Sequence, residues 1–394
     1  MTAAGLDLDR LSFDRGAHLL LQRALADLSP GDRLAVTGAD PALPVHLRAW
    51  CREHGHHVEA DEAGLSVVRG RADLDRWAGA ERAGDPAPSG VVEAPPARWG
   101  LAARGALVEA GGPEPRFDFG HRDAVWADVA PALYRHAASA QWDPDQAVDW
   151  TAEFALPAEI EQAVVQVMTY LIENEQAALV IPARLLGRIH PHFREVMQLL
   201  AVQTADEARH MDVFTRRALL RGGRLGTSSA GGRESLATLL DEPDFSMASF
   251  MLSVLGEGTF LNLLEFLERT APDPVTRRVT GLARRDEARH VAFGVAHLHH
   301  LGTIDPHLRT RLRAAIERRH DALIDTAGLN QDVFDALVVL AAGSWSGEAI
   351  GRGWDQVQAL QAEMDEGRRR RLVHIGFPDD EATELSRLHT RNFM

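Results

Sequence analysis

The spacing of apolar residues divides the chain into two regions. In the first 70 residues the apolar segments are short, and the spacing of their apolar residues changes from one segment to the next. Helical spacing occurs in 16–28 and 43–55, and the pattern typical of a strand occurs in 33–38. Residues 56–70 predict a β-hairpin that turns at 62–64. This order of short elements predicts a small α/β domain.

From about residue 121 onward, helical spacing dominates. Four long segments, 156–187, 190–220, 244–270 and 273–302, place apolar residues three and four positions apart. Within each pair one segment follows the other directly, and a Gly/Ser-rich loop of about twenty residues separates the two pairs. This arrangement is typical of a four-helix bundle, and the pattern predicts further helices up to the C-terminus.

The predicted domain organisation follows from these patterns. Residues 1–70 form the α/β domain, and 121–394 form a helical domain with a C-terminal helical extension. Residues 71–120 form a connecting segment, in which the Pro/Ala/Gly-rich stretch 83–98 predicts a linker. The expected fold class is therefore mainly α.

Composition excludes several classes of function. The formal net charge is −15, which argues against nucleic acid as the main partner. All 42 basic residues are arginine, so lysine Schiff-base chemistry is excluded. The single cysteine, Cys51, cannot form an internal disulfide or a Cys-ligated cluster, and its place on the apolar side of the 43–55 helix predicts a packed core thiol. No signal-peptide pattern or run of eighteen apolar residues occurs, so we expect a cytoplasmic protein without a membrane span.

A five-residue string, Asp-Glu-Ala-Arg-His, occurs at 206–210 and again at 286–290. Residues three apart share one face of a helix, so Glu207 and His210 point the same way, and so do Glu287 and His290. In both copies that face is otherwise mostly apolar, which places the carboxylate and the imidazole toward the core. A lone Glu-x-x-His is commonplace, but two copies on apolar faces are not.

Each of the other two long helices also directs a carboxylate toward the core. Glu257 aligns with the apolar residues of 244–270, and Glu175 aligns with those of 156–187, whereas its neighbour Glu173 lies on a more polar face. Glu175 lies 32 residues before Glu207, and Glu257 lies 30 residues before Glu287, as two matching antiparallel helix pairs require. Buried carboxylates need counter-charge. Four carboxylates carry a charge of −4, which two divalent cations cancel, and oxygen and nitrogen ligands suit iron or manganese.

With this set in place, residues 135–300 resemble the ferritin-like di-iron oxygenase superfamily, which includes the ribonucleotide reductase small subunit, acyl-carrier desaturases and arylamine N-oxygenases. The resemblance implies two iron ions, or a Mn/Fe pair, with O₂ as co-substrate. It also implies that Asp206 and Asp286, just before the ligand glutamates, each hold the opposite ligand histidine. The six metal ligands it implies are Glu175, Glu207, His210, Glu257, Glu287 and His290.

The chain departs from several of these relatives. The reductase subunit usually carries a radical tyrosine four residues after the first ligand histidine, where this chain has Phe214, and its only tyrosines are Tyr134 and Tyr170. Arylamine N-oxygenases have an extra histidine ligand where this chain has Ala283. A stored tyrosyl radical at the usual position is therefore not expected, and the N-oxygenase option is weakened.

The N-terminal region, by its order of elements, resembles the TusA/SirA-like sulfur-carrier fold. That family carries sulfur on a cysteine just before its first helix, and the matching place here is near Asp14. Sulfur transfer therefore does not carry over. A module for docking or regulation is the expected role.

Four further features have simple structural interpretations. Arg209 and Arg289 are expected to act as salt-bridge or helix-end partners, not as substrate binders, and to be incidental to the metals. His297, His299 and His300 are expected to form a solvated helix end, and the four arginines at 368–371 a solvated helix face. The glycines on either side of Glu257 leave room either for a substrate beside the metals or for helix packing.

The leading hypothesis is an O₂-activating non-haem di-iron oxidase or oxygenase that hydroxylates, N-oxidises, desaturates or cleaves a small organic molecule. The alternatives are a non-enzymatic metal-binding or sulfur-trafficking adaptor and a Mn/Fe ligand-binding oxidase. The expected partner is a small-molecule substrate, with neither nucleic acid nor membrane. An external electron donor and a homodimer stay open.

Overall fold

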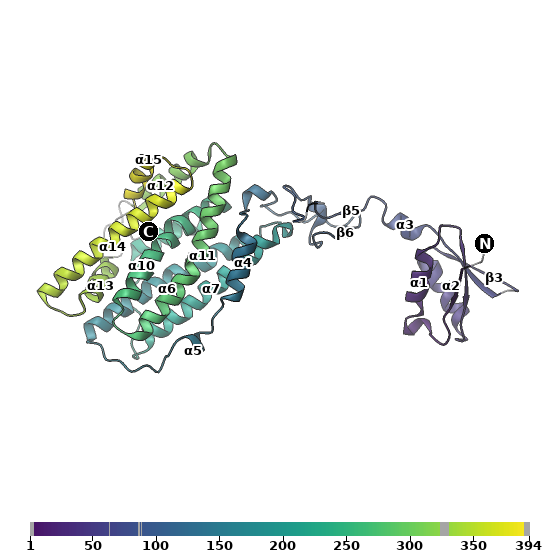
Figure 1. The fold of residues 1–394 in the computed structure, drawn as a ribbon, viewed down its shortest axis with the longest axis horizontal. Helices are drawn as coiled ribbons and strands as arrows, with labels where there is room; N and C mark the ends of the chain where they lie inside the picture. The colour runs from purple at the N-terminus through teal and green to yellow at the C-terminus, as the bar shows by residue number, and fades with distance from the viewer. Residues whose placement is uncertain (1–3, 63, 86, 88, 324–330, 390–394) are drawn as a thin grey trace. The chain divides into compact units, whose positions relative to one another are not determined.

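The structure is a computed structural model that describes residues 4–62, 64–85, 87, 89–323 and 331–389. The chain divides into two compact units, 1–90 with 102–114 and 91–101 with 115–394. The first unit therefore extends beyond the predicted boundary at residue 70. Figure 1 draws both units, with the first in purple and blue and the second from blue through teal to yellow.

The first unit contains a four-stranded sheet in the order β1-β2-β4-β3, with β1 parallel to β2 and the remaining pairs antiparallel. Its elements are β1 (Ala4–Asp7), α1 (Ala17–Ala26), β2 (Arg33–Thr37), α2 (Leu43–Glu53), β3 (His57–Asp61) and β4 (Gly64–Val68). The predicted helices, strand and hairpin are confirmed, except that Ala63 in the predicted turn lies outside the described residues. The acidic strand β1 was not predicted.

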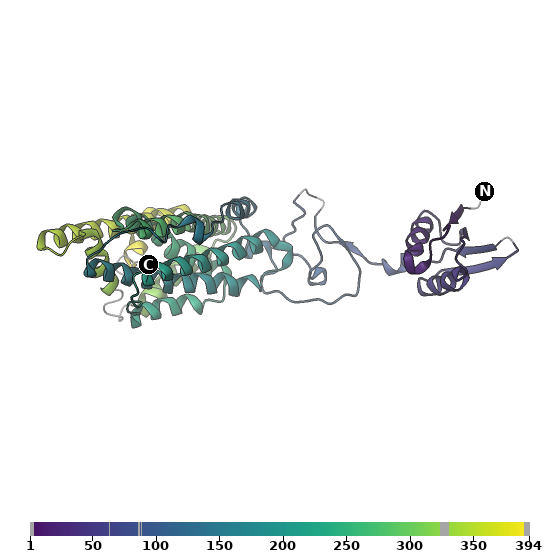
Figure 2. The same ribbon diagram turned by 90° about the horizontal axis from the view of Figure 1, so that it is seen from below.

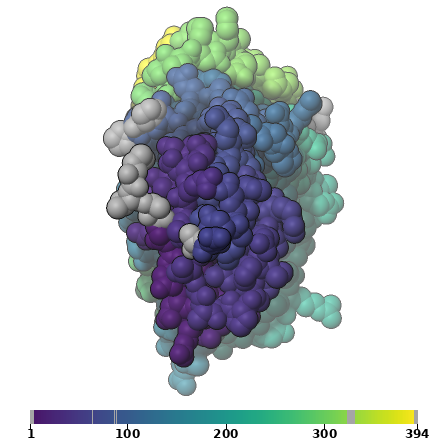
Figure 3. All heavy atoms as spheres, turned by 90° about the vertical axis from the view of Figure 1, so that its right-hand side faces the viewer, coloured from purple at the N-terminus to yellow at the C-terminus, as the bar shows by residue number. Residues whose placement is uncertain are grey.

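The core of this unit forms where the apolar faces of the helices meet alternate residues of the sheet. Leu34 and Val36 of β2 are buried with Leu21 of α1 and Leu47 of α2. Cys51 belongs to the same core, and burial raises the pKa of its thiol to about 12, so the predicted packed thiol is confirmed. Figure 3 shows the surface of this unit, with its first residues in purple.

The predicted connecting segment contains ordered elements. Helix α3 (Ala72–Arg76) is followed by the short strand β5 (Glu81–Arg82), which pairs with β6 (Leu107–Val108). Within the second unit, Trp99 is 9% exposed, and its ring centroid lies 5.4 Å from that of His192. Hydrogen bonds also hold residues of the Pro/Ala/Gly-rich stretch 83–98: the Ala83 amide donates to the Ala106 carbonyl oxygen at 2.9 Å, and the Val92 amide donates to His192 Nε2 at 3.0 Å.

The second unit contains the predicted four-helix bundle. Its first two long helices, α6 (Ala158–Leu186) and α7 (Arg194–Leu219), pack side by side, as both views of the ribbon show (Figures 1 and 2). The third consists of α9 (Phe245–Ser249), a π-helical segment (Phe250–Glu257) and α10 (Gly258–Thr270). The fourth is α11 (Pro274–Ile304), which begins after Asp273, whose carboxylate accepts a hydrogen bond from the Thr276 amide.

The third helix is apolar enough to resemble a membrane span. Residues Phe245–Thr270 contain an 18-residue window with a mean hydropathy of 1.4, but 78% of that window is buried inside the bundle. A core helix surrounded on all sides by other helices has this composition. Its π-helical segment ends at Glu257, so the local change of pitch sets the direction of a predicted ligand.

Seven more helices complete the described part of this unit. They are α4 (Ala130–Ser139), α5 (Pro144–Ala147), α8 (Ala230–Leu240), α12 (Leu308–Leu323), α13 (Gln331–Ala342), α14 (Gly347–His374) and α15 (Asp379–Arg387). The prediction of a loop between the second and third long helices is wrong for 230–240. There the Ser229 hydroxyl accepts a hydrogen bond from the Gly232 amide and begins α8.

Two predictions of solvated side chains are also wrong. His297 is fully buried: its Nε2 lies 2.8 Å from the Ser246 hydroxyl and its Nδ1 lies 2.9 Å from the Trp126 carbonyl oxygen. Arg368 is fully buried as well, and it donates to the Ser386 carbonyl oxygen at 2.8 Å. Both residues lie on helix faces that other segments of the chain cover, which periodicity within one helix does not reveal.

Candidate metal centre

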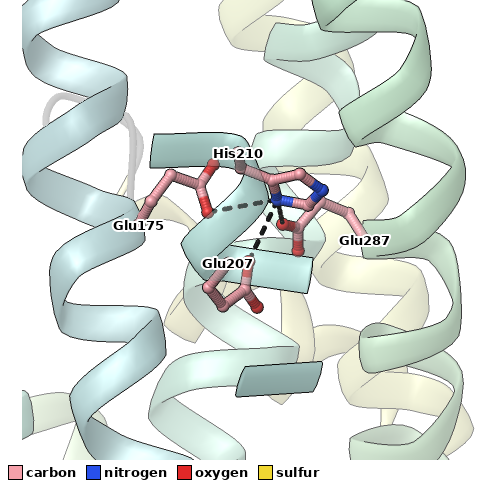
Figure 4. Close-up of side chains that lie close together, drawn as sticks. All are labelled: Glu175, Glu207, His210 and Glu287. Carbon is pink, nitrogen blue, oxygen red and sulfur yellow. Dashed lines mark hydrogen bonds and ion pairs between the residues drawn. The ribbon is translucent and has the colours of Figure 1, made fainter. Parts of the chain in front are cut away.

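The six predicted ligands lie together in the middle of the bundle, and each is at most 5% exposed. They form two groups that share two carboxylates. The first group is Glu175, Glu207, His210 and Glu287, and the second is Glu207, Glu257, Glu287 and His290. Figure 4 shows the first group, with Glu175 and Glu287 approaching the His210 ring from α6 and α11. Glu173 belongs to neither group, so the structure places Glu175 at this position.

The shared carboxylates each present one oxygen to each histidine. Glu207 lies 3.1 Å from His210 Nδ1 through Oε2 and 3.0 Å from His290 Nδ1 through Oε1. Glu287 lies 3.3 Å from His210 Nδ1 through Oε1 and 3.3 Å from His290 Nδ1 through Oε2. If an ion binds in each group, Glu207 and Glu287 would serve both ions.

Each group also has one carboxylate of its own. Glu175 Oε2 lies 3.5 Å from His210 Nδ1, and Glu257 Oε1 lies 4.0 Å from His290 Nδ1. Ligand bonds of about 2.1 Å at right angles place neighbouring ligand atoms about 3 Å apart. The distances from the shared carboxylates, 3.0–3.3 Å, are close to that value, whereas the unshared carboxylates lie farther from the histidines, at 3.5 and 4.0 Å.

The two halves of the repeat support each other crosswise. His210 Nε2 lies 3.1 Å from Asp286 Oδ2, and His290 Nε2 lies 3.2 Å from Asp206 Oδ2. An aspartate at Nε2 keeps the proton on that nitrogen and leaves Nδ1 free to face the carboxylates. The positions of Asp206 and Asp286 behind the opposite histidines thus match the geometry that the resemblance implied.

The arginines of the repeat bind both aspartates, as predicted for salt-bridge partners. Arg209 pairs with Asp206 and lies 3.2 Å from Asp286, while Arg289 pairs with Asp286 and lies 3.2 Å from Asp206. The expected salt bridges are therefore present, but they cross between α7 and α11. Two guanidinium groups balance the two aspartates and leave the four glutamates as the uncompensated charge.

Three polar residues around the site were missed by sequence reasoning. Gln141 donates to Asp206 at 2.9 Å, Trp142 donates through Nε1 to Asp286 at 2.8 Å, and Gln203 donates to Glu257 at 2.9 Å. Gln141 and Trp142 follow α4 and carry no helical pattern that would point to the site. Gln203 had a signal, because it lies one turn before Glu207 on the same buried stripe.

Charge within the site is unevenly distributed. Burial and the neighbouring Glu287 raise the pKa of Glu175 and of Glu257 well above that of an ordinary glutamate. Burial also opposes ionisation of Asp286, but hydrogen bonds from His210, Trp142 and Arg289 hold its pKa well below the usual range. The aspartate layer is thus internally compensated, whereas the glutamate layer needs cations.

Unpartnered oxygens test whether metal ions fit. Among the described residues, Glu175 Oε1 and Glu257 Oε2 are buried and have no hydrogen-bond partner. A buried carboxylate oxygen without a partner is costly, by several kcal/mol as an order of magnitude. Four carboxylates and two imidazole Nδ1 atoms around two centres satisfy two divalent ions, and this mixture of oxygen and nitrogen ligands fits iron and manganese.

An apolar cavity of about 30 Å³ lies against the glutamate layer. Glu175, Glu257 and Glu287 lie at its edge, and apart from Asn174 the rest of its lining is apolar: Ala177, Ala178, Leu236, Leu239, Leu252, Gly256 and Phe260. A space of this size holds a water or a diatomic molecule. The histidines are absent from the described lining, so the cavity opens toward the carboxylates.

The two glycines beside Glu257 have different roles. Gly256 lines the cavity, as a substrate-space interpretation requires. A Cβ on Gly258 would lie 2.4 Å from Nε of Arg371, which donates to the Val254 carbonyl oxygen at 2.8 Å. Gly258 therefore serves helix packing, and the arginine satisfies a carbonyl of the π-helical segment.

Comparisons with known proteins give a structural similarity only. No family model and no curated protein sequence matches the chain. A Synechococcus protein with aldehyde deformylating oxidase activity is 20% identical with a TM-score of 0.42, and the match covers 60% of this chain and 98% of that one.

Two variants of an R2-like ligand-binding oxidase with a reconstituted Mn/Fe cofactor are also similar. For the anaerobically reconstituted variant, the identity is 14%, the TM-score 0.46, and the match covers 63% of this chain and 95% of that chain. For the aerobically reconstituted variant, the identity is 15% and the TM-score is 0.45, and the match covers 65% of this chain and 92% of that chain. Metal binding by this chain is therefore inferred from its own donor set.

Proposed function

We propose that this protein is an O₂-dependent non-haem di-iron oxidase or oxygenase that acts on a small organic molecule. The single observation that carries the proposal is the pair of buried four-residue groups that share Glu207 and Glu287 and open onto an apolar cavity. Two ferrous ions held by such ligands supply two electrons to dioxygen. A Mn/Fe pair is the alternative cofactor that the same donor set supports.

The residues of this chain have separable roles in that reaction. His210 and His290 are oriented by Asp286 and Asp206, so their Nδ1 atoms are fixed before any ion binds. Leu236, Leu239, Leu252 and Phe260 shield the carboxylate side from bulk water, which limits side reactions with solvent. Complete reduction of dioxygen takes four electrons. The remaining two come from the substrate or from an external donor.

The test uses the full chain, reconstituted with two equivalents of Fe²⁺ without oxygen and then exposed to air-saturated buffer. We expect about two bound iron ions per chain, rapid O₂ uptake and new visible absorption. Glu207→Ala removes a carboxylate common to both groups and should abolish uptake. Asp212→Ala is the matched control, because Asp212 lies on the same helix with its side chain 51% exposed.

The two outcomes discriminate between enzyme and adaptor. Absence of bound iron or manganese after anaerobic reconstitution would overturn the proposal. Tight iron binding with no O₂ uptake would favour a non-enzymatic metal-binding protein. Competition between Fe²⁺ and Mn²⁺ during reconstitution, followed by elemental analysis, distinguishes the di-iron enzyme from a Mn/Fe oxidase.

A further inference from the structure

The repeated segments on α7 and α11 are not equivalent around the metal ligands. Residues 206–210 and 286–290 are identical, so every position in one segment has a counterpart 80 residues away. One turn before the ligand glutamate, α7 has Gln203 where α11 has Ala283. Both positions are buried, at 3% and 0% exposure, so this difference lies inside the site.

Gln203 fixes one of the two unshared carboxylates. Its Nε2 donates to Glu257 Oε1 at 2.9 Å, while Glu257 Oε2 has no partner among the described residues. Oε1, which also faces His290 Nδ1 at 4.0 Å, is therefore held by the protein, and its second lone pair and the unpartnered Oε2 are left for an ion. The amide belongs to α7 and the carboxylate to the third helix, so the contact ties the two helices together at the site.

A second difference between the two repeats makes room for the π-helical segment that carries Glu257. Where α7 has Phe214, α11 has Gly294, and a Cβ there would lie 2.4 Å from Cβ of Ser253. Only glycine allows this close approach. Ser253 is 4% exposed and adds a second polar group beside Glu257. The Glu257 half of the site is thus built around a carboxylate in a fixed position.

The Glu175 half lacks these supports. Ala283 has no polar atom to donate, and Phe214 places an aromatic ring 6.3 Å from the His210 ring. Glu175 Oε2 lies 3.5 Å from His210 Nδ1, whereas Glu175 Oε1 has no hydrogen-bond partner among the described residues. Without an amide at this position, Glu175 has more freedom to turn toward the cavity that it lines.

We propose that Gln203 makes the two metal positions unequal, so that the position at Glu257 and His290 binds its divalent ion first and more tightly than the position at Glu175 and His210. A ligand that is already held in place loses less conformational freedom on binding. Partners behind a ligand typically change metal affinity by about 10- to 100-fold. The inference rests on the metal-binding part of the proposed function and is independent of the reaction.

The experiment is a titration of the metal-free full chain with Mn²⁺, followed by low-temperature electron paramagnetic resonance and by competition with a fluorescent chelator. We expect two binding steps separated by at least about 10-fold in affinity. The first equivalent should give the six-line spectrum of an isolated Mn²⁺ ion, and the second should convert it into the broad signal of a coupled pair.

Two variants assign the difference to Gln203. Gln203→Met keeps the side-chain length but removes the donor, so the first step should weaken about 10-fold and merge with the second. Its spectrum at one equivalent should then mix empty, single and paired sites. Gln176→Met is the matched control, because Gln176 lies next to Glu175 in sequence but is exposed, and it should leave both steps unchanged.

The outcomes separate this inference from the proposed function. Equal affinities in the unmodified protein, with pairs already present at one equivalent, would overturn it without affecting the enzyme assignment. A Gln203→Met protein that melts like the unmodified one and keeps two separate steps would also overturn it. Failure of the unmodified protein to bind any Mn²⁺ or Fe²⁺ would overturn the proposed function and this inference together.

Discussion

Asp286 of α11 accepts a hydrogen bond from Nε2 of His210 on α7 at 3.1 Å, and it is 1% exposed. Its counterpart Asp206 lies 3.2 Å from His290 Nε2. Each copy of the repeat therefore supplies a Glu and a His to the ion centres and an aspartate that orients the histidine of the other copy. The repeated string works only as a pair, because neither copy orients its own histidine.

This contact predicts a loss of metal affinity in Asp286→Asn. The amide keeps the shape of the carboxylate but not its charge, so it holds the Nε2 proton of His210 less strongly and makes Nδ1 a weaker ligand. We expect metal affinity to fall by about 10- to 100-fold. Competition with a chelator of known affinity measures the change. Asp305→Asn, at the C-terminal end of the same helix, is the control, and an equal loss there would contradict the interpretation.

The crossed salt bridges predict a stability effect that is separate from metal binding. Arg289 is 6% exposed, so Arg289→Met leaves Asp286 and Asp206 with one guanidinium between them in a buried position. Removal of one partner of a buried ion pair typically costs about 3–5 kcal/mol. Urea denaturation of the metal-free protein measures the free energy of unfolding.

A double variant tests the cause of that loss. Because Asp286→Asn removes one of the negative charges that Arg289 balances, Arg289→Met should cost less in the Asp286→Asn background than in the unmodified protein. Strict additivity of the two changes would show that the arginine acts through packing and not through charge.

The bundle could be predicted from the sequence, and the structure brings together all six residues that the sequence pointed to, because a carboxylate on an apolar helical stripe is conspicuous. The sequence was not sufficient for interactions between helices. The string itself shows Arg209 three residues after Asp206, but the contact of Arg209 with Asp286 depends on how α7 packs against α11. Gln141 lies 65 residues from the aspartate it binds, and no periodicity links the two.

The third helix shows a different limit of sequence analysis. Of the residues Phe250–Glu257, all but Gly256 are buried, so the segment has no polar face from which its pitch could be derived. A continuous α-helix and a π-helical segment would both have the same pattern of apolar residues there, so the pattern does not distinguish them. Arg368 illustrates the related problem for charge, since four consecutive arginines indicate a solvated face unless a later helix covers one of them.

From the cavity beside the glutamates we predict that its volume controls the access of dioxygen to the ions. Ala178 lines it and is 5% exposed, so Ala178→Leu should fill most of the roughly 30 Å³ of space. We expect unchanged iron loading and O₂ uptake at least about 10-fold slower, with a stability cost of about 1–3 kcal/mol from overpacking. An oxygen electrode and iron analysis measure the two effects.

A control variant distinguishes loss of access from general strain. Ala315 of α12 is 3% exposed and lies in the same apolar core but does not line the cavity, so Ala315→Leu introduces similar overpacking elsewhere. Uptake that slows equally in both variants would show that the cavity is not the route of dioxygen to the site.

From the burial of His297 we predict how acid changes the free energy of unfolding. Burial lowers the pKa of this histidine to about 4, although its hydrogen bond to the Trp126 carbonyl opposes that change. An unfolded histidine has a pKa of about 6.5, so between pH 6.5 and pH 4 the unfolded chain binds a proton that the folded chain does not. Stability is therefore complete above about pH 6.5 and falls as the pH drops toward 4, by at most about 3 kcal/mol from this group.

The measurement compares the unmodified protein with His297→Gln, both without metal, by urea denaturation at pH 7 and at pH 4.5. Glutamine can bond to the Ser246 hydroxyl and the Trp126 carbonyl but does not titrate, so the variant should lose less stability on acidification. Titration of the glutamate layer is common to both proteins and cancels in the comparison. If the two proteins lose the same free energy between pH 7 and pH 4.5, His297 is not the group responsible for the acid sensitivity.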